Sequence, residues 1–96
     1  MFPANQDRIV PFNIPARSSI NINIANGTSC FIQGFGLASC HFAFQAFVRV
    51  NGAIELSELY KGSSITYTKA TNTLTIDNAA AGATIVFVTV YNGSVS

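Results

Sequence analysis

Residues 64–78 read SITYTKATNTLTIDN and contain two runs in which polar and apolar side chains alternate. Alternation with a period of two is typical of half-buried β-strands. Taking residues 69–72 as a four-residue loop gives four cross-strand pairs: Tyr67 with Leu74, Ile65 with Ile76, Thr68 with Thr73 and Thr66 with Thr75. Asn72 suits the left-handed position that such loops often need. The stretch therefore predicts a β-hairpin with one apolar face and one threonine face.

The same period recurs outward from this hairpin along most of the chain. Further strands are predicted at residues 19–24, 28–33, 38–50, 53–59 and 83–91. The Asn-Gly pairs at 26–27 and 51–52 are strong turn signals, and no helical periodicity extends beyond two turns. About eight short strands favour an all-β chain, folded as a single antiparallel two-sheet β-sandwich, a jelly-roll-like domain or a small barrel.

The N-terminal stretch differs from the rest because it holds all three prolines, at positions 3, 11 and 15. Proline lacks an N–H group and restricts the residue before it. We therefore expect residues 1–18 to form an extended arm or an edge strand. Residues 19–96 are expected to form the β-sandwich domain.

The composition is unusual in its charge. Apolar residues make up 49% of the 96 residues, but charged residues only 9%, against about 25% in typical globular domains. Two interpretations remain open: a surface of neutral polar side chains, or a surface that neighbouring copies cover, where charges would be costly to desolvate. The five Lys and Arg residues are scattered, so we expect no nucleic-acid partner.

The chain shows neither a secretory leader nor a membrane span. Its first residues lack the basic and apolar regions of a signal peptide, and no apolar run reaches about 18 residues. Unless a leader was removed before residue 1, we expect a protein made inside the cell, without a membrane partner.

Cys30 and Cys40 flank a glycine-rich segment. A hairpin centred on Phe35 would place the two cysteines opposite each other on the apolar face. This leaves three alternatives: two buried thiols, a cross-strand disulfide, or a reactive thiol beside His41. Alternation sends His41 to the other face, which disfavours the third alternative. The neighbourhood also lacks the ligands of a zinc site.

The acidic residues do not suggest catalysis. Glu55 and Glu58 are three residues apart on a predicted strand, so they should point to opposite faces, unlike paired catalytic carboxylates. A three-residue loop at 51–53 would instead pair Arg49 with Glu55, and Val48 with Leu56. Without a constellation of base, nucleophile or metal ligand, we predict no enzyme activity and no cofactor.

The predicted last strand is apolar on both faces. Its valines line one side, while Ile85, Phe87 and Tyr91 line the other, and Phe47 adds to the outer side of the strand at 38–50. A small sandwich should have one wet face per sheet. These four residues are therefore candidate subunit contacts, although the N-terminal arm could also cover them.

Residues 64–78 together with residues 82–91, GATIVFVTVY, resemble segments of small β-sandwich virion proteins, namely the decoration, tail and fibre modules of tailed bacteriophages. The resemblance covers about a third of the chain. It implies a homo-oligomeric structural protein, often a trimer, that assembles in the host cytoplasm with other virion proteins.

A carbohydrate-binding or adhesion module is the alternative. It would use Tyr60, Tyr67 or Tyr91 as stacking platforms for glycans, with Asn and Thr donors beside them. The lack of tryptophan disfavours this alternative.

Overall fold

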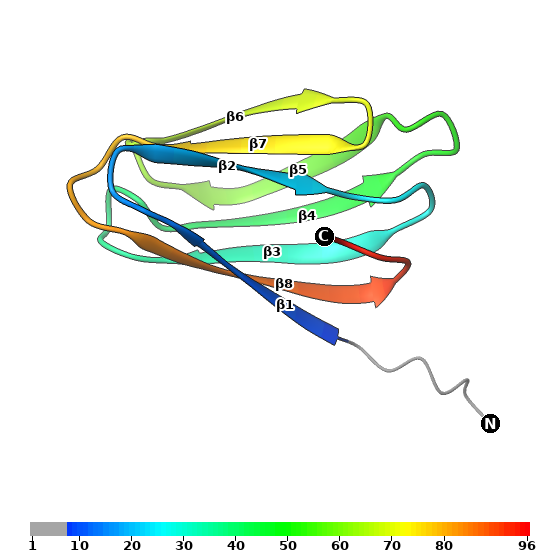
Figure 1. The fold of residues 1–96 in the computed structure, drawn as a ribbon, viewed down its shortest axis with the longest axis horizontal. Helices are drawn as coiled ribbons and strands as arrows, with labels where there is room; N and C mark the ends of the chain where they lie inside the picture. The colour runs from blue at the N-terminus through cyan, green and yellow to red at the C-terminus, as the bar shows by residue number, and fades with distance from the viewer. Residues whose placement is uncertain (1–7) are drawn as a thin grey trace.

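The computed structural model describes residues 8–96, which form eight β-strands in two antiparallel sheets (Figure 1). The strands are β1 (Arg8–Ile14), β2 (Ser18–Asn23), β3 (Ser29–Phe35), β4 (Phe42–Val48), β5 (Ile54–Lys61), β6 (Ile65–Ala70), β7 (Thr73–Asn78) and β8 (Thr84–Asn92). The predicted all-β, two-sheet sandwich is confirmed.

One sheet has five strands in the order β1-β8-β3-β4-β5, and the other has three in the order β2-β7-β6. Because side chains alternate along each strand, each sheet turns one set of residues inward. The inward set includes the fully buried Phe42 and Phe44, whose rings stack with centroids 4.8 Å apart. Apolar side chains from both sheets thus form one core.

Among residues 8–96, the few buried polar side chains all have a hydrogen-bond partner. The Thr84 hydroxyl donates to the carbonyl of Cys40 at 2.8 Å. The Asn78 amide nitrogen donates to the carbonyl of Gly82 at 2.9 Å, and its oxygen accepts from the N–H of Ala80 at 3.0 Å. These bonds offset the cost of taking polar groups out of water.

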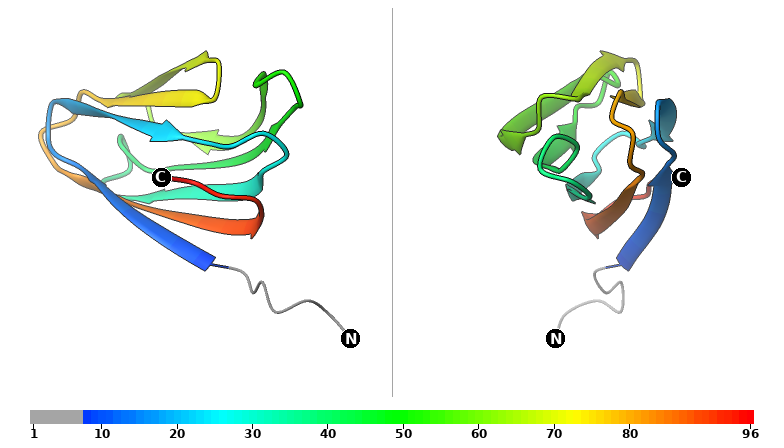
Figure 2. Two further views of the ribbon diagram at one scale, coloured as in Figure 1. Left: turned by 45° about the vertical axis from the view of Figure 1, so that its right-hand side comes forward. Right: turned by 90° about the vertical axis from the view of Figure 1, so that its left-hand side faces the viewer.

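Residues 8–14 of the expected N-terminal arm form β1, the edge strand of the larger sheet, which pairs with β8 alone. Residues 1–7 of that arm lie outside the described residues. After residues 15–17 the chain enters β2 in the other sheet, so that β1 and β2 diverge into different layers (Figure 2).

The hairpin of β6 and β7 has a tighter loop than predicted. Its pairs are Lys69 with Leu74, Tyr67 with Ile76, Thr68 with Thr75 and Ile65 with Asn78, so the predicted register is wrong by two residues. The shift is even, and each side chain therefore keeps its predicted face. Asn72 has the predicted positive φ, 59°. Contacts outside the hairpin hold this turn: the Asn72 amide nitrogen donates to the carbonyl of Ile24 at 2.7 Å.

Cys30 and Cys40 are not opposite each other. Cys30 pairs with Ala46 in the β3–β4 hairpin, whereas Cys40 lies in the loop before β4. The prediction was wrong because the chain leaves the ladder after Phe35 and makes a wide loop instead of a tight turn. The Cys40 N–H donates to the carbonyl of Leu37 at 2.9 Å within this loop. Both thiols are free and buried.

The β4–β5 register also differs from the prediction. Phe47 pairs with Glu55 and Val48 with Ile54, so the predicted pairing of Val48 with Leu56 is wrong. Arg49 nevertheless reaches Glu55 diagonally, with Nε 3.1 Å from Oε2. The predicted ion pair is therefore confirmed, although the strand register from which it was predicted is wrong.

The last three residues return to the end of β2. Asn23 and Ser96 exchange two backbone hydrogen bonds of 2.8 and 2.9 Å, and Val95, which pairs with Ile24, is buried. This short segment occupies part of the free edge of β2 (Figure 1).

Candidate functional site: the outer face of the five-stranded sheet

The outer face of the five-stranded sheet carries large apolar side chains that the fold leaves in contact with solvent. Five of them are between 44 and 63% exposed: Ile9, Phe35, Phe47, Ile85 and Tyr91. They come from β1, β3, β4 and β8. We call this surface the apolar face; Phe31 and Phe87, both half-buried, belong to it.

The apolar face has a defined order. At the end where β8 begins, Phe35 pairs with Ile85. The rings of Phe35 and Phe87 pack edge to face there, with centroids 5.8 Å apart. At the opposite end, Phe47 lies beside Ser29 on the neighbouring strand. Phe31 falls between the two ends.

The polar side chains that interrupt the apolar face are neutral. Gln33, Gln45 and Thr89 occupy its centre. Charge is confined to the margin, where Arg49 and Glu55 neutralise each other. A surface of this composition can be covered without stripping water from an unpaired charge.

All four residues predicted as subunit contacts fall on strands of this sheet. Phe47, Ile85 and Tyr91 are exposed, while Phe87 is half-buried. Phe31 and Phe35 were missed, although they alternate with the buried Ile32 and so carried the same signal. Residues 8–14 extend the face at its edge, because β1 adds to the sheet beside β8.

The outer face of the three-stranded sheet is entirely different. Its central row runs Asn21, Thr75 and Thr68 across the three strands. The Thr75 hydroxyl donates to Asn21 Oδ1 at 2.8 Å, and the Thr73 hydroxyl donates to Asn23 Oδ1 at 3.3 Å. These groups satisfy one another on a solvated surface, which we call the threonine face.

The three tyrosines do not form one platform. Tyr60 lies against His41, with ring centroids 4.8 Å apart, and Tyr91 is on β8. Tyr67 faces inward against Phe44 and its hydroxyl donates to Glu58 at 3.3 Å. Burial, the negative charge of Glu58 and this hydrogen bond together raise the pKa of Tyr67.

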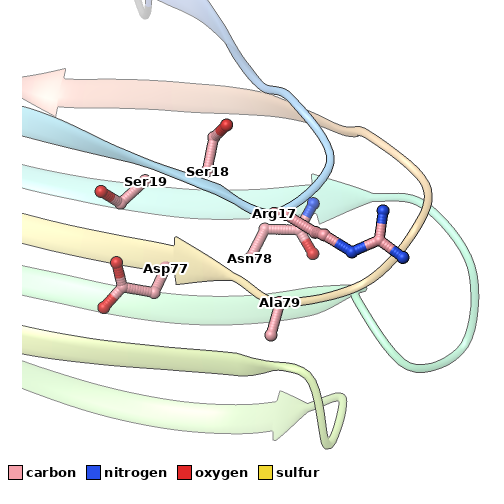
Figure 3. Close-up of a pocket in the computed structure, with 6 residues that line it drawn as sticks. All are labelled: Arg17, Ser18, Ser19, Asp77, Asn78 and Ala79. Atoms are coloured by element: carbon pink, nitrogen blue, oxygen red, sulfur yellow. The ribbon is translucent and has the colours of Figure 1, made fainter.

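A polar hollow of about 410 Å³ lies at the end of the smaller sheet where β2 begins and β7 ends (Figure 3). It is lined by Arg17, Ser18, Ser19, Asp77, Asn78 and Ala79. Figure 3 shows the Arg17 and Asp77 side chains pointing in different directions. The hollow offers hydrogen bonds to a small polar molecule but holds no two groups together for acid–base chemistry.

The remaining titratable groups are dispersed. Glu55 pairs with the outward Phe47 and Glu58 with the inward Phe44, so the two carboxylates point to opposite sides of β5. Burial raises the pKa of Cys30 to about 11, which keeps its thiol protonated and poorly nucleophilic. Among residues 8–96, no three His, Cys, Asp or Glu side chains are placed to hold a metal ion. The same residues contain no helix suited to crossing a membrane.

Comparison with known proteins identifies a structural neighbour but no family. No protein-family model matches the chain, and no curated protein matches its sequence. The fold is similar to part of tailspike protein gp49 from Acinetobacter baumannii bacteriophage Fri1, described as a capsular polysaccharide depolymerase, with a TM-score of 0.62 and 15% sequence identity. The similarity covers 94% of this chain and 18% of the tailspike chain. A β-sandwich of this fold therefore also occurs as a segment of a bacteriophage tailspike protein.

Proposed function

We propose that this chain is a non-enzymatic structural module of a bacteriophage virion, of the tail or fibre type, that associates with further copies of itself through the apolar face. The observation that carries the proposal is the exposure of Phe35, Phe47 and Ile85 on one sheet. Contiguous apolar patches of this kind mark protein contacts. The likeness to a tailspike segment supports the virion context.

The chemistry of the apolar face favours a second copy as the partner. In a symmetric contact the same surface meets itself, so a charged surface would repel its mate. This face carries charge only at its margin, in the Arg49–Glu55 pair. Five strands of about seven residues cover roughly 24 by 23 Å, or about 550 Å² in projection. That is comparable to the roughly 800 Å² of accessible surface that each partner contributes to a standard interface.

The strand edges are less suited to assembly than the face. Pro11 removes an N–H group from β1, and residues 94–96 occupy the end of β2. A bulge opposite Ala43 and Phe44 distorts β5. Lys61 Nζ donates to the carbonyl of Ile65 at 2.8 Å, at the start of β6. Prolines, bulges, lysines and covering segments all discourage edge-to-edge pairing.

The absence of enzyme activity is part of the proposal. The neighbouring tailspike is described as a depolymerase, but the similar segment is a small part of it. In this chain Glu55 is engaged by Arg49 and Glu58 by Tyr67, on opposite sides of one strand. This arrangement supports a structural role over a glycoside-hydrolysing one.

The native mass tests the proposal. Sedimentation equilibrium at micromolar concentrations should give twice the 10.2 kDa chain mass, because a face that meets itself closes in a dimer. Phe47→Asp should convert it to monomer, because a buried unpaired carboxylate would weaken association at least about 100-fold, or about 2.7 kcal/mol.

Thr68→Asp is the matched control. It adds the same charge to the threonine face, at an exposed position, and should leave the oligomer intact. A strictly monomeric parent protein, or equal effects of the two aspartates, would contradict the proposal.

A further inference from the structure

The connection between β1 and β2 is a short hinge between two layers. Three residues, Pro15, Ala16 and Arg17, separate Ile14 at the end of β1 from Ser18 at the start of β2. In Figure 2 the two strands leave this hinge in different directions. The conformation of this hinge determines whether β1 can reach β8 of its own chain.

Arg17 adopts an unfavourable backbone conformation in this hinge. Its φ is +54°, the left-handed region in which a side chain with a Cβ is crowded and where Gly or Asn is common. Its N–H donates to the carbonyl of Ala80 at 3.1 Å, which holds the turn closed. An extended hinge would remove this strain, and strained short hinges favour domain swapping.

The β1 strand is an edge strand, which its own sheet holds from one side along its full length. It pairs with β8 alone, and Ile14 is its only buried residue, while Val10 and Phe12 are half-buried. At the hinge, the Asn78 amide lies 3.5 Å from the carbonyls of both Ile14 and Pro15. In an exchanged assembly, the β1 of another copy would make these same contacts.

We infer that β1 is exchanged between copies in the assembled protein, so that β1 of one chain pairs with β8 of a second. The Ile14 site and the Asn78 amide of each copy would then receive the partner's strand, and Arg17 would relax to an extended conformation. The inference deepens the proposed self-association, since it names the segment that crosses between copies, but it does not depend on the apolar face being the contact.

Two substitutions at Arg17 should push the exchange in opposite directions. Glycine tolerates the positive φ of the closed hinge, so Arg17→Gly should raise the fraction of unexchanged chains. Proline cannot adopt a positive φ, so Arg17→Pro should open the hinge. After equilibration, the exchanged fraction should differ by tenfold or more between the two variants, as measured by the share of covalent dimer when each variant also carries the pair of cysteines described below. Equal fractions would overturn the inference.

A cross-strand disulfide tests the exchange independently of native mass. Val10 pairs with Val88 across β1 and β8, and both side chains lie on the core side of the sheet, away from the apolar face. In the double variant Val10→Cys/Val88→Cys, oxidation should yield covalent dimers on a denaturing gel without reductant. The two single-cysteine variants, which retain the buried Cys30 and Cys40, are the controls and should give monomers.

The result separates this inference from the proposed function. Oxidised monomers that contain an internal disulfide would overturn strand exchange, even where the native protein is an oligomer through the apolar face. Covalent dimers combined with an oligomer that Phe47→Asp leaves unchanged would support exchange and contradict the proposed contact.

Discussion

The two outer faces of this sandwich arise from the same alternation of side chains but have opposite chemistry. On the threonine face the outward positions hold short neutral polar residues that hydrogen-bond across strands, as Thr75 does with Asn21. On the apolar face they hold aromatic and aliphatic residues such as Phe35 and Ile85, both about half exposed. The inner faces of the two sheets, by contrast, share one apolar core.

This difference separates the apolar surface that the fold needs for its stability from apolar surface that it does not need. A sandwich is stabilised by burying one face of each sheet, and a solvated outer face is compatible with that requirement. The threonine face meets this expectation. The apolar face adds exposed hydrophobic area that contributes little to an isolated domain, which is why we propose it as the contact with other chains.

The largest expected effect comes from making the two faces alike. Replacing the central row of the threonine face by valine, as Asn21→Val/Thr68→Val/Thr75→Val, should create a second apolar face and lower solubility about tenfold or more. Both partners of the Asn21–Thr75 bond are removed, so no polar group is left unsatisfied. Saturation concentration measures the effect. Serine at the same three positions is the control, and comparable solubility of the two triple variants would contradict the comparison.

A second prediction probes the core that both faces share. Burial raises the pKa of Cys30 from 9.0 to about 11, so the unfolded chain loses this proton at a lower pH than the folded chain. Below pH 9 the thiol is protonated in both the folded and the unfolded chain, and the free energy of unfolding is at its full value. As the pH rises from 9 through 11, the free energy of unfolding falls by up to about 2–3 kcal/mol.

Urea unfolding at pH 8 and pH 10.5, in parent and Cys30→Ala, measures this loss. The parent should lose more stability than the variant, in which the other alkaline groups still titrate. Equal losses of stability in the parent and in Cys30→Ala would contradict the prediction, because they would show that the Cys30 thiol has the same pKa in the folded and the unfolded chain.

The smallest expected effect lies at the margin of the apolar face. Arg49 and Glu55 are 59 and 58% exposed, and ion pairs with such exposure contribute about 0–1 kcal/mol. A double-mutant cycle with Arg49→Ala and Glu55→Ala should give a coupling energy in that range, falling as salt is added. A coupling above about 2 kcal/mol would mean that the pair is buried, and hence that an interface covers this margin in solution.

Strand positions and faces were predictable because they depend on residues close in sequence. Alternation placed Ile32 inward and Phe47 outward, and Asn72 was recognised as a left-handed turn residue. Registers were less predictable. The β6–β7 loop has two residues instead of the four predicted. The alternation of polar and apolar residues cannot distinguish the two loop lengths, because both put the same side chains on each face. The position of Cys40 was missed because the loop before β4 is held by contacts to distant residues such as Gly82 and Thr84.

The sequence by itself determined that the chain is all-β, which side chains are buried, and that more apolar residues exist than one sandwich core can use. These properties follow from period-two alternation, which each strand carries locally. Only the tertiary structure decided that Phe31, Phe35, Phe47 and Ile85 share one face, and that β1 belongs to the sheet opposite β2. The reason is physical: which strands become neighbours depends on loop closure and on packing between sheets, to which residues far apart in sequence contribute together.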